Sequence, residues 1–315
     1  MIQLPPKAQH PTLYFIGVTT GQSSIMKLFP LWAEALGIQA VIKGIDLPIH
    51  APAEDYRAVA EFIRDDPLSM GALVTTHKID MYVACRDLFD YRDPYAERFG
   101  ELSCISKNGG RYCAHAKDPI SCGLALDSFI PRGHFRDTKA QVCVLGAGGS
   151  ALSISAYLAN EKVHGSDDLP SEIHLSNRST PRLAEAVRIL DFLNVPMGYH
   201  VCREPALNDR IVESLPEGSV VVNATGLGKD RPGSPLTDNC RFPKNGIVWE
   251  LNYRGSLEFW HQALAQKQTQ KLTVEEGWTY FIHGWTQVIA EVFHVDITGD
   301  RLAMCDRIAR EMHKK

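Results

Sequence analysis

Long apolar runs, paired cysteines and clusters of basic residues are all missing from this sequence of 315 residues. Because no apolar run approaches the roughly 18 residues that span a bilayer, we expect no transmembrane helix. The segment from Met1 to Lys7 lacks the charge and the apolar centre of a signal peptide. The eight cysteines contain no C-x-x-C pair, which favours reduced thiols and a cytoplasmic protein over a disulfide framework.

An excess of charge of one sign is missing too. The formal net charge is −4, and Lys and Arg are scattered, so the sequence gives no reason to expect a nucleic acid or a membrane surface as a partner. His77 and His115 have no metal-ligand spacing with a third group, so we interpret them as hydrogen-bonded structural side chains and expect no metal. The length fits one or two domains, and both a monomer and a homodimer remain open.

The most informative segment present runs from Val142 to Ala151, where a short apolar stretch leads into Gly-Ala-Gly-Gly-Ser-Ala. This is the G-x-G-x-x-A form of the dinucleotide fingerprint, in its required place between a strand and a helix. Gly146 permits the tight turn, Gly148 leaves room for the pyrophosphate, and Ala151 lets the helix pack close to the strand. The alternative is a Gly-rich turn without a ligand. The predicted coenzyme contacts here are Gly146, Ala147, Gly148, Gly149, Ser150 and Ala151.

The next predicted strand, residues 171–176, indicates which nucleotide is bound. An NAD site usually has an acidic residue at this strand end, whereas an Arg there accommodates a 2′-phosphate. This chain has Asn177 and Arg178, and Arg182 follows four residues later. Two guanidinium groups on either side of Ser179 suit a phosphate dianion, which predicts NADP(H). The alternative is a pair of solvated arginines at the start of a helix.

A third apolar stretch extends the predicted nucleotide domain. Val220 to Val222 reads as a buried strand that ends in a Gly-rich loop, and we expect this loop to approach the nicotinamide. Glu161 to Pro170 is interpreted as a surface insertion, because it lengthens the spacing between Gly146 and Asn177. The predicted contacts from the loop are Asn223, Ala224, Thr225 and Gly226.

The N-terminal part of the chain alternates between strand-like and helix-like segments. Apolar runs predict strands at 13–16, 40–45 and 72–75, and amphipathic spacing predicts helices at 25–36 and 53–65. This alternation is typical of an open α/β sheet. Residues 119–129 are predicted to form a connecting helix. Residues 274–315 read as mostly helical, and we expect them to pack back on the first domain.

Six parts of the chain, in order along nearly its whole length, resemble motifs of the shikimate dehydrogenase family. Gly17 to Ser24 is similar to the family's substrate loop, and Val74 to Lys78 is similar to V-T-x-P-x-K with one residue fewer. The remaining matches are Ala114–Asp118 with G-D-N-T-D, Gly146–Ala151 together with Asn177–Arg182 in the coenzyme motifs, Asn252–Tyr253 at a strand end, and Glu276–Gly277 before the last helices.

The resemblance implies two α/β domains and a reversible NADP-linked oxidation of a ring hydroxyl. Residues 1–118 with 275–315 would form the open-sheet substrate-binding domain, and residues 119–274 a Rossmann-type NADP-binding domain. Lys78 and Asp118 match the family's catalytic pair, in which a Lys exchanges the hydroxyl proton and a carboxylate positions it. The residues alone favour a solvated lysine after a strand and a helix cap before Pro119.

The same matches imply which residues meet the ligands. The substrate would be shikimate, quinate or a related polyhydroxylated or amino-substituted ring acid. Gly277 joins the implied coenzyme contacts. The implied substrate contacts are Ser23, Thr75, Ser103, Tyr253 and Gln287.

Several positions depart from the family pattern, all of them in the implied substrate shell. Ile25 stands where the second serine of the substrate loop is expected, Leu73 replaces an asparagine, and Ser103 replaces another. The N-T pair of G-D-N-T-D is Ala116–Lys117, which adds a positive charge beside Asp118. Loss of hydrogen-bonding groups changes discrimination strongly. The alternative to a dehydrogenase is therefore an NADP-binding sensor or accessory protein that no longer turns over a ring acid.

Overall fold

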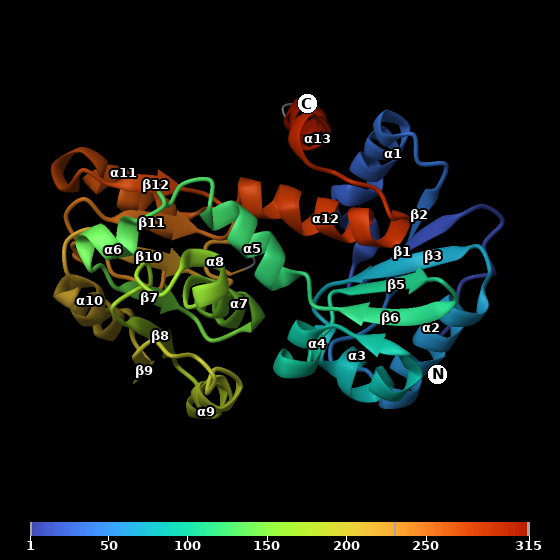
Figure 1. Ribbon diagram of the computed structural model, residues 1–315, viewed down its shortest axis with the longest axis horizontal. Coiled ribbons are helices and arrows are strands. Elements are labelled where there is room, and N and C mark those ends of the chain that lie inside the picture. Colours follow the sequence, from blue (N-terminus) through green and yellow to red (C-terminus); the bar gives the residue numbers. More distant parts are fainter. Residues whose placement is uncertain (1, 230, 314–315) are drawn as a thin grey trace. The chain divides into compact units, whose positions relative to one another are not determined.

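The computed structural model describes residues 2–229 and 231–313, and the chain divides into two compact units (Figure 1). The first unit contains the chain up to Lys117 and again from Gly284, and the second contains Asp118–His283. Each unit has one six-stranded sheet with helices against it. The predicted fold class, two α/β domains, is confirmed.

The sheet of the first unit has the strand order β2-β1-β3-β5-β6-β4. β1 is parallel to β2 and β3, whereas β5 is antiparallel to both β3 and β6. The carboxyl ends of β1, β3 and β6 therefore lie at one edge of the sheet, together with the amino end of β5. The strands are β1 (Thr12–Gly17), β2 (Val41–Asp46), β3 (Ser69–Val74), β4 (Tyr91–Arg92), β5 (Cys104–Asn108) and β6 (Arg111–His115).

Helices cover both faces of this sheet, with α1, α12 and α13 on one face and α2, α3 and α4 on the other (Figure 1). Alternation along β1 explains the division, because Phe15 packs edge-on against Trp285 of α12 while Tyr14 and Ile16 join the core of α2 and α3. Trp32 of α1 donates its Nε1–H to the carbonyl of Cys305 in α13 at 2.8 Å. The bounds are α1 (Ile25–Leu36), α2 (Ala53–Asp65), α3 (Lys78–Cys85), α4 (Pro94–Phe99), α12 (Trp278–Phe293), α13 (Gly299–His313) and two short 3-10 helices, η1 (Thr20–Gln22) and η2 (Arg86–Leu88).

The sheet of the second unit is parallel throughout, in the order β12-β11-β10-β7-β8-β9. Counted from β7, this is the 6-5-4-1-2-3 order of dinucleotide-binding domains, with its reversal point between β7 and β10. The strands are β7 (Val142–Leu145), β8 (Ile173–Asn177), β9 (Met197–Val201), β10 (Val220–Asn223), β11 (Ile247–Glu250) and β12 (Thr273–Glu275). The helices are α5 (Asp118–Leu126), α6 (His134–Thr138), α7 (Gly149–Leu158), α8 (Glu161–His164), α9 (Thr180–Ile189), α10 (Pro205–Ser214) and α11 (Glu258–Gln270).

The strongest periodic patterns in the sequence predict the elements most accurately. The helices at 25–36 and 53–65 and the strand at 142–145 are confirmed at both ends. Gly37 ends α1 in the left-handed conformation, with φ at 71°. The C-terminal helix α13 packs against α1 of the first unit, as expected from the sequence.

The segment from Glu161 to Pro170, predicted as a surface insertion, contains regular structure and a buried side chain. It contains the short helix α8 and the buried Asp168. The Asp168 carboxylate accepts N–H groups from Gly133, Phe135 and Arg136 at 2.5–3.1 Å. Burial opposes ionisation, but these bonds outweigh it and lower the pKa of Asp168. The segment thus stabilises the start of α6.

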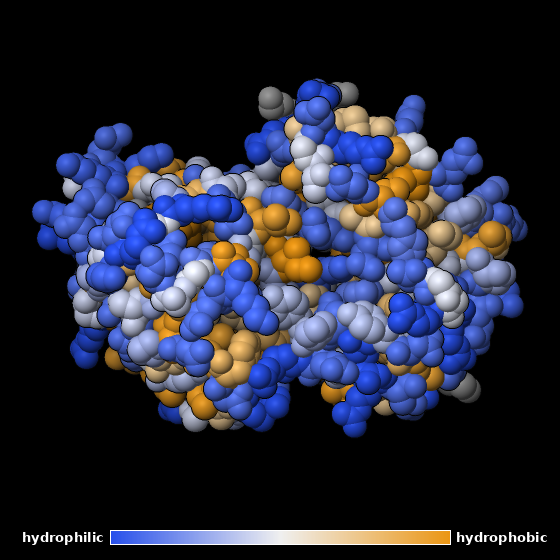
Figure 2. Space-filling model, in the orientation of Figure 1, coloured by the Kyte–Doolittle hydropathy of each residue, from blue (hydrophilic) through white to orange (hydrophobic). Residues whose placement is uncertain are grey.

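Figure 2 shows a face on which hydrophilic residues predominate and hydrophobic ones form small groups. The most exposed large apolar side chains, Val83 and Ile49, lie in separate segments. All eight cysteines are buried free thiols. Among residues 2–229 and 231–313, no helix is long and apolar enough to cross a membrane.

Candidate functional site

The predicted fingerprint forms the turn from β7 into α7, at the reversal point of the second sheet. Gly146 has φ at 131°, and a Cβ there would lie 2.8 Å from the carbonyl oxygen of Ala224. Gly148 precedes α7, and a Cβ built on it meets no atom within 4 Å. Ala151, in the first turn, is fully buried. Gly146 is therefore required by the fold, whereas Gly148 leaves open space at a helix N-terminus, which suits an anion.

The other fingerprint residues continue this arrangement. Ala147 is buried in the turn, and Gly149 opens α7. Ser150 lies within 3.4 Å of the hydroxyl of Tyr280, measured between the two oxygens. The first turn of α7 thus presents small side chains and the N–H groups of a helix start, as expected for the end of a helix that faces a phosphate.

The end of β8 carries the residues predicted to select NADP. Asn177 accepts the N–H of Ser179 through Oδ1 at 2.9 Å, and Ser179 caps α9 by accepting the N–H of Arg182 at 3.4 Å. Arg178 is exposed between them. The guanidinium of Arg182 bonds to Glu185 at 2.8 Å. Arg178 is thus the better placed of the two to accept a new anionic partner.

A buried carboxyl network lies at the ends of β10 and β11. Glu250 is fully buried and accepts Nδ2–H of Asn223 at 2.7 Å. It also accepts the backbone N–H and Nδ2–H of Asn252 at 2.8 and 2.7 Å. Burial raises the pKa of Glu250 to about 7, although these donors favour the charged form. Sequence reasoning missed Glu250, and the only signal was an acidic residue closing an apolar strand.

The network also fixes the predicted nicotinamide loop. Asn223 Oδ1 accepts both the N–H and the hydroxyl of Thr225, at 3.0 and 2.6 Å. Ala224 lies against Gly146 through its carbonyl, and Gly226 is exposed. The loop is therefore held by side chains beneath it, while its outer surface carries no bulky group.

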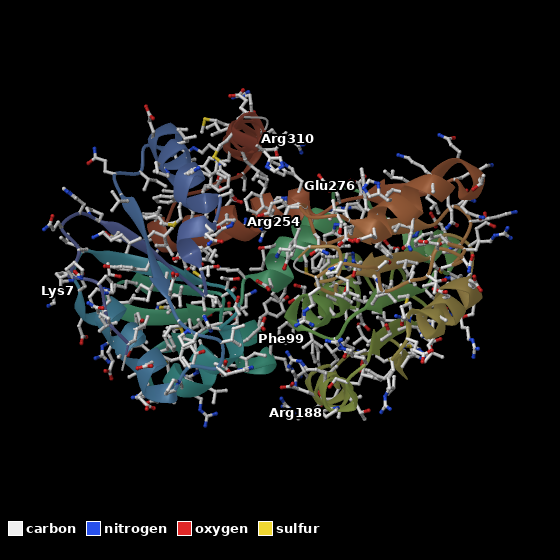
Figure 3. The ribbon with its side chains drawn as sticks, turned by 180° about the vertical axis from the view of Figure 1, so that it is seen from behind. Lys7, Phe99, Arg188, Arg254, Glu276 and Arg310 are labelled. Atoms are coloured by element: carbon white, nitrogen blue, oxygen red, sulfur yellow. The ribbon has the colours of Figure 1, made fainter. Side chains whose placement is uncertain are left out.

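Further predicted residues of the second unit lie after β11 and in the segment before α12. Glu276 lies between β12 and α12 (Figure 3). A Cβ on the next residue, Gly277, would collide with the carbonyl of Leu251, so only glycine fits there. Tyr253 packs its ring 4.4 Å from that of Phe281, between centroids. These contacts explain why Asn252–Tyr253 and Glu276–Gly277 occur together.

In the first unit, the resembling motifs meet at the edge where β1, β3 and β6 end. Thr75 follows β3 and donates its N–H to Ile16 at 3.0 Å. Thr76 takes a φ of 49°, and the N–H of His77 bonds back to Thr75, which closes a very tight turn. Because of this tight turn, the motif is one residue shorter than V-T-x-P-x-K and Lys78 is still the first residue of α3.

The loop after β1 places its polar residues at the same edge. Thr20 donates its N–H and hydroxyl to Asp46 Oδ1 at 2.8 and 2.5 Å, and Ser23 is half-buried after η1. Ile25 and Leu73 are core side chains, with exposed fractions of 0% and 8%. The two positions that lack the family's polar groups therefore serve packing in this chain.

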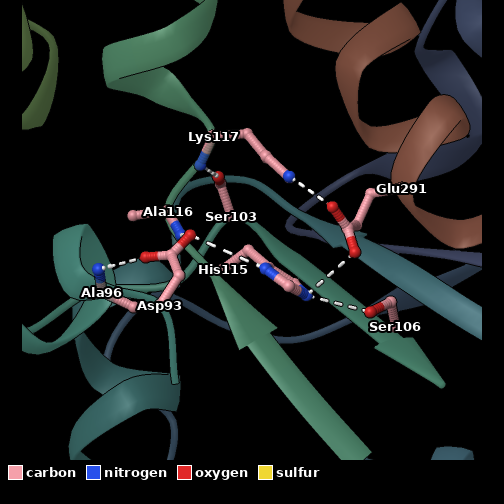
Figure 4. Close-up of polar contacts among 8 residues, drawn as sticks. All are labelled: Asp93, Ala96, Ser103, Ser106, His115, Ala116, Lys117 and Glu291. Atoms are coloured by element: carbon pink, nitrogen blue, oxygen red, sulfur yellow. Dashed lines mark hydrogen bonds and ion pairs between the residues drawn. The ribbon is translucent and has the colours of Figure 1, made fainter. Parts of the chain in front are cut away.

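Figure 4 shows a buried polar network at the end of β6. Lys117 donates its ammonium to Glu291 of α12 at 2.6 Å. His115 Nε2 lies 3.4 Å from the other oxygen of Glu291 and 2.9 Å from Ser106 Oγ, and its Nδ1 is 3.6 Å from Asp93. Burial opposes ionisation of Glu291, but the Lys117 bond and the neighbouring positive groups lower its pKa. The added charge of Lys117 is thus balanced inside the protein.

The structure groups the predicted residues by unit. Thr75, Lys78, Ser103 and Ser23 occupy one edge of the first sheet. Gln287 lies one turn before Glu291, on the same face of α12. Asp118 and Tyr253 belong to the second unit with the coenzyme residues, and Asp118 is the buried first residue of α5.

The histidines considered as ligands have structural neighbours. His77 Nδ1 lies 3.0 Å from the hydroxyl of Tyr56, and His115 belongs to the network of Figure 4. Within the part of the chain that the structure describes, no group of three or more His, Cys, Asp or Glu side chains could hold a metal ion.

Comparison with known sequences finds shikimate dehydrogenases. No protein-family model matches the chain. A shikimate dehydrogenase (NADP(+)) of Streptococcus thermophilus is 28% identical over 180 residues, 57% of this chain and 58% of that protein. The match to the Paramagnetospirillum magneticum protein of the same name has 26% identity over 76% of this chain and 77% of the relative. The chain thus matches little more than half of the Streptococcus protein's length, in line with a diverged sequence.

Solved structures match over nearly the whole chain. Shikimate 5-dehydrogenase from Listeria monocytogenes has a TM-score of 0.71 with 16% identity, over 98% of this chain and 99% of that one. The Thermus thermophilus enzyme with NADP(H) and shikimate has a TM-score of 0.68 and 21% identity, over 96% and 99%. Quinate dehydrogenase from Corynebacterium glutamicum reaches 0.72 and 17%, over 96% and 99%. At these identities the match shows the shared fold. The family resemblance seen in the sequence is confirmed, because the Streptococcus and Paramagnetospirillum relatives are named shikimate dehydrogenase (NADP(+)).

Proposed function

We propose that this chain is an NADP-dependent oxidoreductase that acts on a ring CH–OH group. It would transfer a hydride reversibly between NADP(H) and shikimate/3-dehydroshikimate or a related cyclic hydroxy acid. The observation that carries the proposal is the all-parallel sheet with a glycine turn at its reversal point. Relatives that are all named shikimate dehydrogenase (NADP(+)) support the same reaction. Residues 119–274 would then form the NADP-binding domain, and residues 1–118 with 275–315 the substrate-binding domain of a cytoplasmic monomer or homodimer.

The residues at the second sheet edge fit NADP. The open space at Gly148 and the N–H groups that start α7 suit the pyrophosphate, and Arg178 and Arg182 beside the cap of α9 suit the 2′-phosphate. Bound there, the nicotinamide would supply the hydride chemistry. The proposed contacts are Gly146, Ala147, Gly148, Gly149, Ser150, Ala151, Asn177, Arg178, Ser179, Arg182, Asn223, Ala224, Thr225, Gly226 and Gly277.

The protein's own part in the reaction would be binding and proton transfer. Lys78 would accept the hydroxyl proton during oxidation and return it during reduction, and Asp118 would favour the charged form of the amine. Lys78 is half-buried at the start of α3, so its amine can be partly removed from water and still reach a substrate. Ser23, Thr75, Tyr253 and Gln287 would bind the ring substituents.

The substrate shell favours an altered specificity within this class. Ile25 and Leu73 are packed in the core, so they cannot replace the hydrogen bonds that a serine and an asparagine would make. Lys117 does not compensate as a free cation, because Glu291 already balances its charge. We therefore propose that the substrate is a ring acid bound through fewer hydrogen bonds than the family motifs would make with shikimate.

The decisive assay measures formation of reduced coenzyme by the purified full chain. Shikimate, quinate and aminated analogues are tested with NADP and NAD in parallel, and Lys78→Ala purified in the same way controls for contaminating enzymes. Turnover with NADP that is lost in the variant supports the proposal. Tight NADP binding without turnover of any acid contradicts it and supports a sensor or accessory role instead.

A further inference from the structure

Ser103 is a junction of three chain segments at the edge of the first sheet. Its N–H donates to the carbonyl of His115 at 2.9 Å, and its carbonyl accepts the N–H of Val74 at 2.9 Å. Its hydroxyl oxygen accepts the backbone N–H of Lys117 at 2.8 Å. The side chain is buried, with 4% exposed. Through these bonds Ser103 joins the end of β3 to the end of β6.

The neighbour of Ser103 extends the junction to Lys78. The N–H of Leu102 donates to the backbone carbonyl of Lys78 at 3.1 Å. Two consecutive residues thus fix the backbone of Lys78 on one side and of Lys117 on the other. Lys117 directly precedes Asp118. Leu102 and Ser103 therefore bond to the backbone at or next to both members of the proposed proton-transfer pair.

The chain leading to Asp118 is held at further points. Asp93 accepts the N–H of Ala116 at 3.2 Å and that of Ala96 at 2.6 Å, and Glu291 holds the side chain of Lys117 (Figure 4). Only the bond from Lys117 N–H to Ser103 depends on a small side chain that can be removed without deleting a charge. Losing it would leave a buried donor without an acceptor.

We propose that Ser103 is a positioning residue for the proton-transfer pair, acting through the backbone of Lys117. This rests on the proposed function, because it presumes that Lys78 and Asp118 exchange the substrate proton. Ser103 then fixes the backbone of Lys117, to which Asp118 is directly joined. The adjoining Leu102 N–H fixes the backbone of Lys78, the first residue of α3. The role differs from the substrate contact that the sequence implies for this position.

The test is Ser103→Ala, with Ser219→Ala as a matched control. Ser219 is also buried, and its hydroxyl oxygen accepts the backbone N–H of Gln141 at 3.1 Å, at the opposite end of β7 from the glycine turn. We expect Ser103→Ala to lower kcat about tenfold with KM within about twofold, because small displacements of catalytic groups reduce rate more than binding. The pH profile of kcat should also shift, and Ser103→Thr, which keeps the hydroxyl, should restore it.

A second measurement does not depend on turnover. Hydrogen–deuterium exchange in peptides covering residues 114–120 should be faster in Ser103→Ala and unchanged in Ser219→Ala. A raised KM with unchanged kcat would overturn the proposal in favour of a substrate contact, and so would unchanged exchange. If the wild type turns over no ring acid, the proposed function fails, and exchange alone then decides whether Ser103 fixes this segment.

Discussion

The two sheet edges that carry the predicted residues are built in different ways. At the edge of the second sheet the site consists mainly of backbone: a glycine turn, two helix N-termini and a loop supported from below. At the edge of the first sheet it consists of side chains, including the ion pair of Lys117 with Glu291 and the contact of His115 with Glu291. A backbone site recognises groups shared by all dinucleotides, whereas a side-chain site can be altered to fit one substrate.

The difference explains where this chain has diverged. Substitutions at the nucleotide edge are limited by geometry, since a side chain at Gly146 would collide with Ala224. At the other edge, Ile25 and Leu73 were accommodated in the core without disturbing the sheet. The proposed coenzyme site would therefore be kept while the proposed substrate shell changes.

The largest expected effect is a loss of turnover at the first edge without a loss of coenzyme binding at the second. Lys78→Ala should lower kcat by about 10³-fold, because a lost proton-transfer group typically costs 10²–10⁴-fold. NADPH affinity, measured by fluorescence titration, should stay within about twofold, since Lys78 belongs to the other unit. The pH dependence of kcat should flatten at the same time.

A matched lysine keeps this prediction specific. Lys7→Ala removes an exposed lysine of the same unit (Figure 3) and should leave both kcat and affinity unchanged. Near-normal turnover in Lys78→Ala would refute its role in proton transfer. A parallel loss of NADPH affinity would refute the separation of the two edges.

The second prediction concerns one glutamate at each edge, the buried Glu250 and the half-buried Glu291, with opposite pH dependence. Folding raises the pKa of Glu250 from 4.5 to about 7, so the folded state holds this proton more tightly than the unfolded state. Its contribution to stability is complete below pH 4.5 and is lost as the pH rises through about 7, by about 3 kcal/mol in all. Glu291 has a lowered pKa, so its contribution is present above its unfolded value of 4.5 and is lost on acidification.

Urea unfolding of the wild type, Glu250→Gln and Glu291→Gln at pH 5 and pH 8 measures both contributions. The stability advantage of the wild type over Glu250→Gln should shrink from the lower to the higher pH. Its advantage over Glu291→Gln should stay nearly constant over the same interval, which lies above 4.5, and should shrink in a further measurement at pH 3.5. Parallel changes in the two variants would contradict the difference in electrostatics between the two edges.

The same difference decided how much could be predicted from the sequence. The fingerprint and the capped turn at Ser179 depend on neighbouring residues, so both could be interpreted from local spacing. The network around Lys117 joins Asp93, Ser103 and Glu291, which come from three distant segments. No local pattern indicates that these side chains meet.

Missed elements have a similar cause. The hairpin of β5 and β6 was not predicted, although Asn108-Gly-Gly at its turn is a hairpin signal. Its strands are short and contain charged and polar residues, so apolar periodicity was weak. Glu250 was overlooked because its partner Asn223 is brought to it only by the pairing of β10 with β11, although its other partner, Asn252, lies two residues away in the chain.

The smallest expected effect tests one charged side chain of the backbone-built edge, Arg178. Arg178→Gln should weaken NADP binding about tenfold and leave NAD binding within about twofold, because a charge-assisted bond to the 2′-phosphate is lost. Arg188→Gln is the matched control, since Arg188 is an exposed arginine in the last turn of α9, the helix that follows Arg178 in the chain (Figure 3). Isothermal titration of both variants with both coenzymes measures the four ratios. Equal weakening of NADP and NAD would mean that Arg178 acts on a feature common to both. Selective weakening would mean that the glycine turn and helix ends bind either dinucleotide, and that this single guanidinium makes the choice between them.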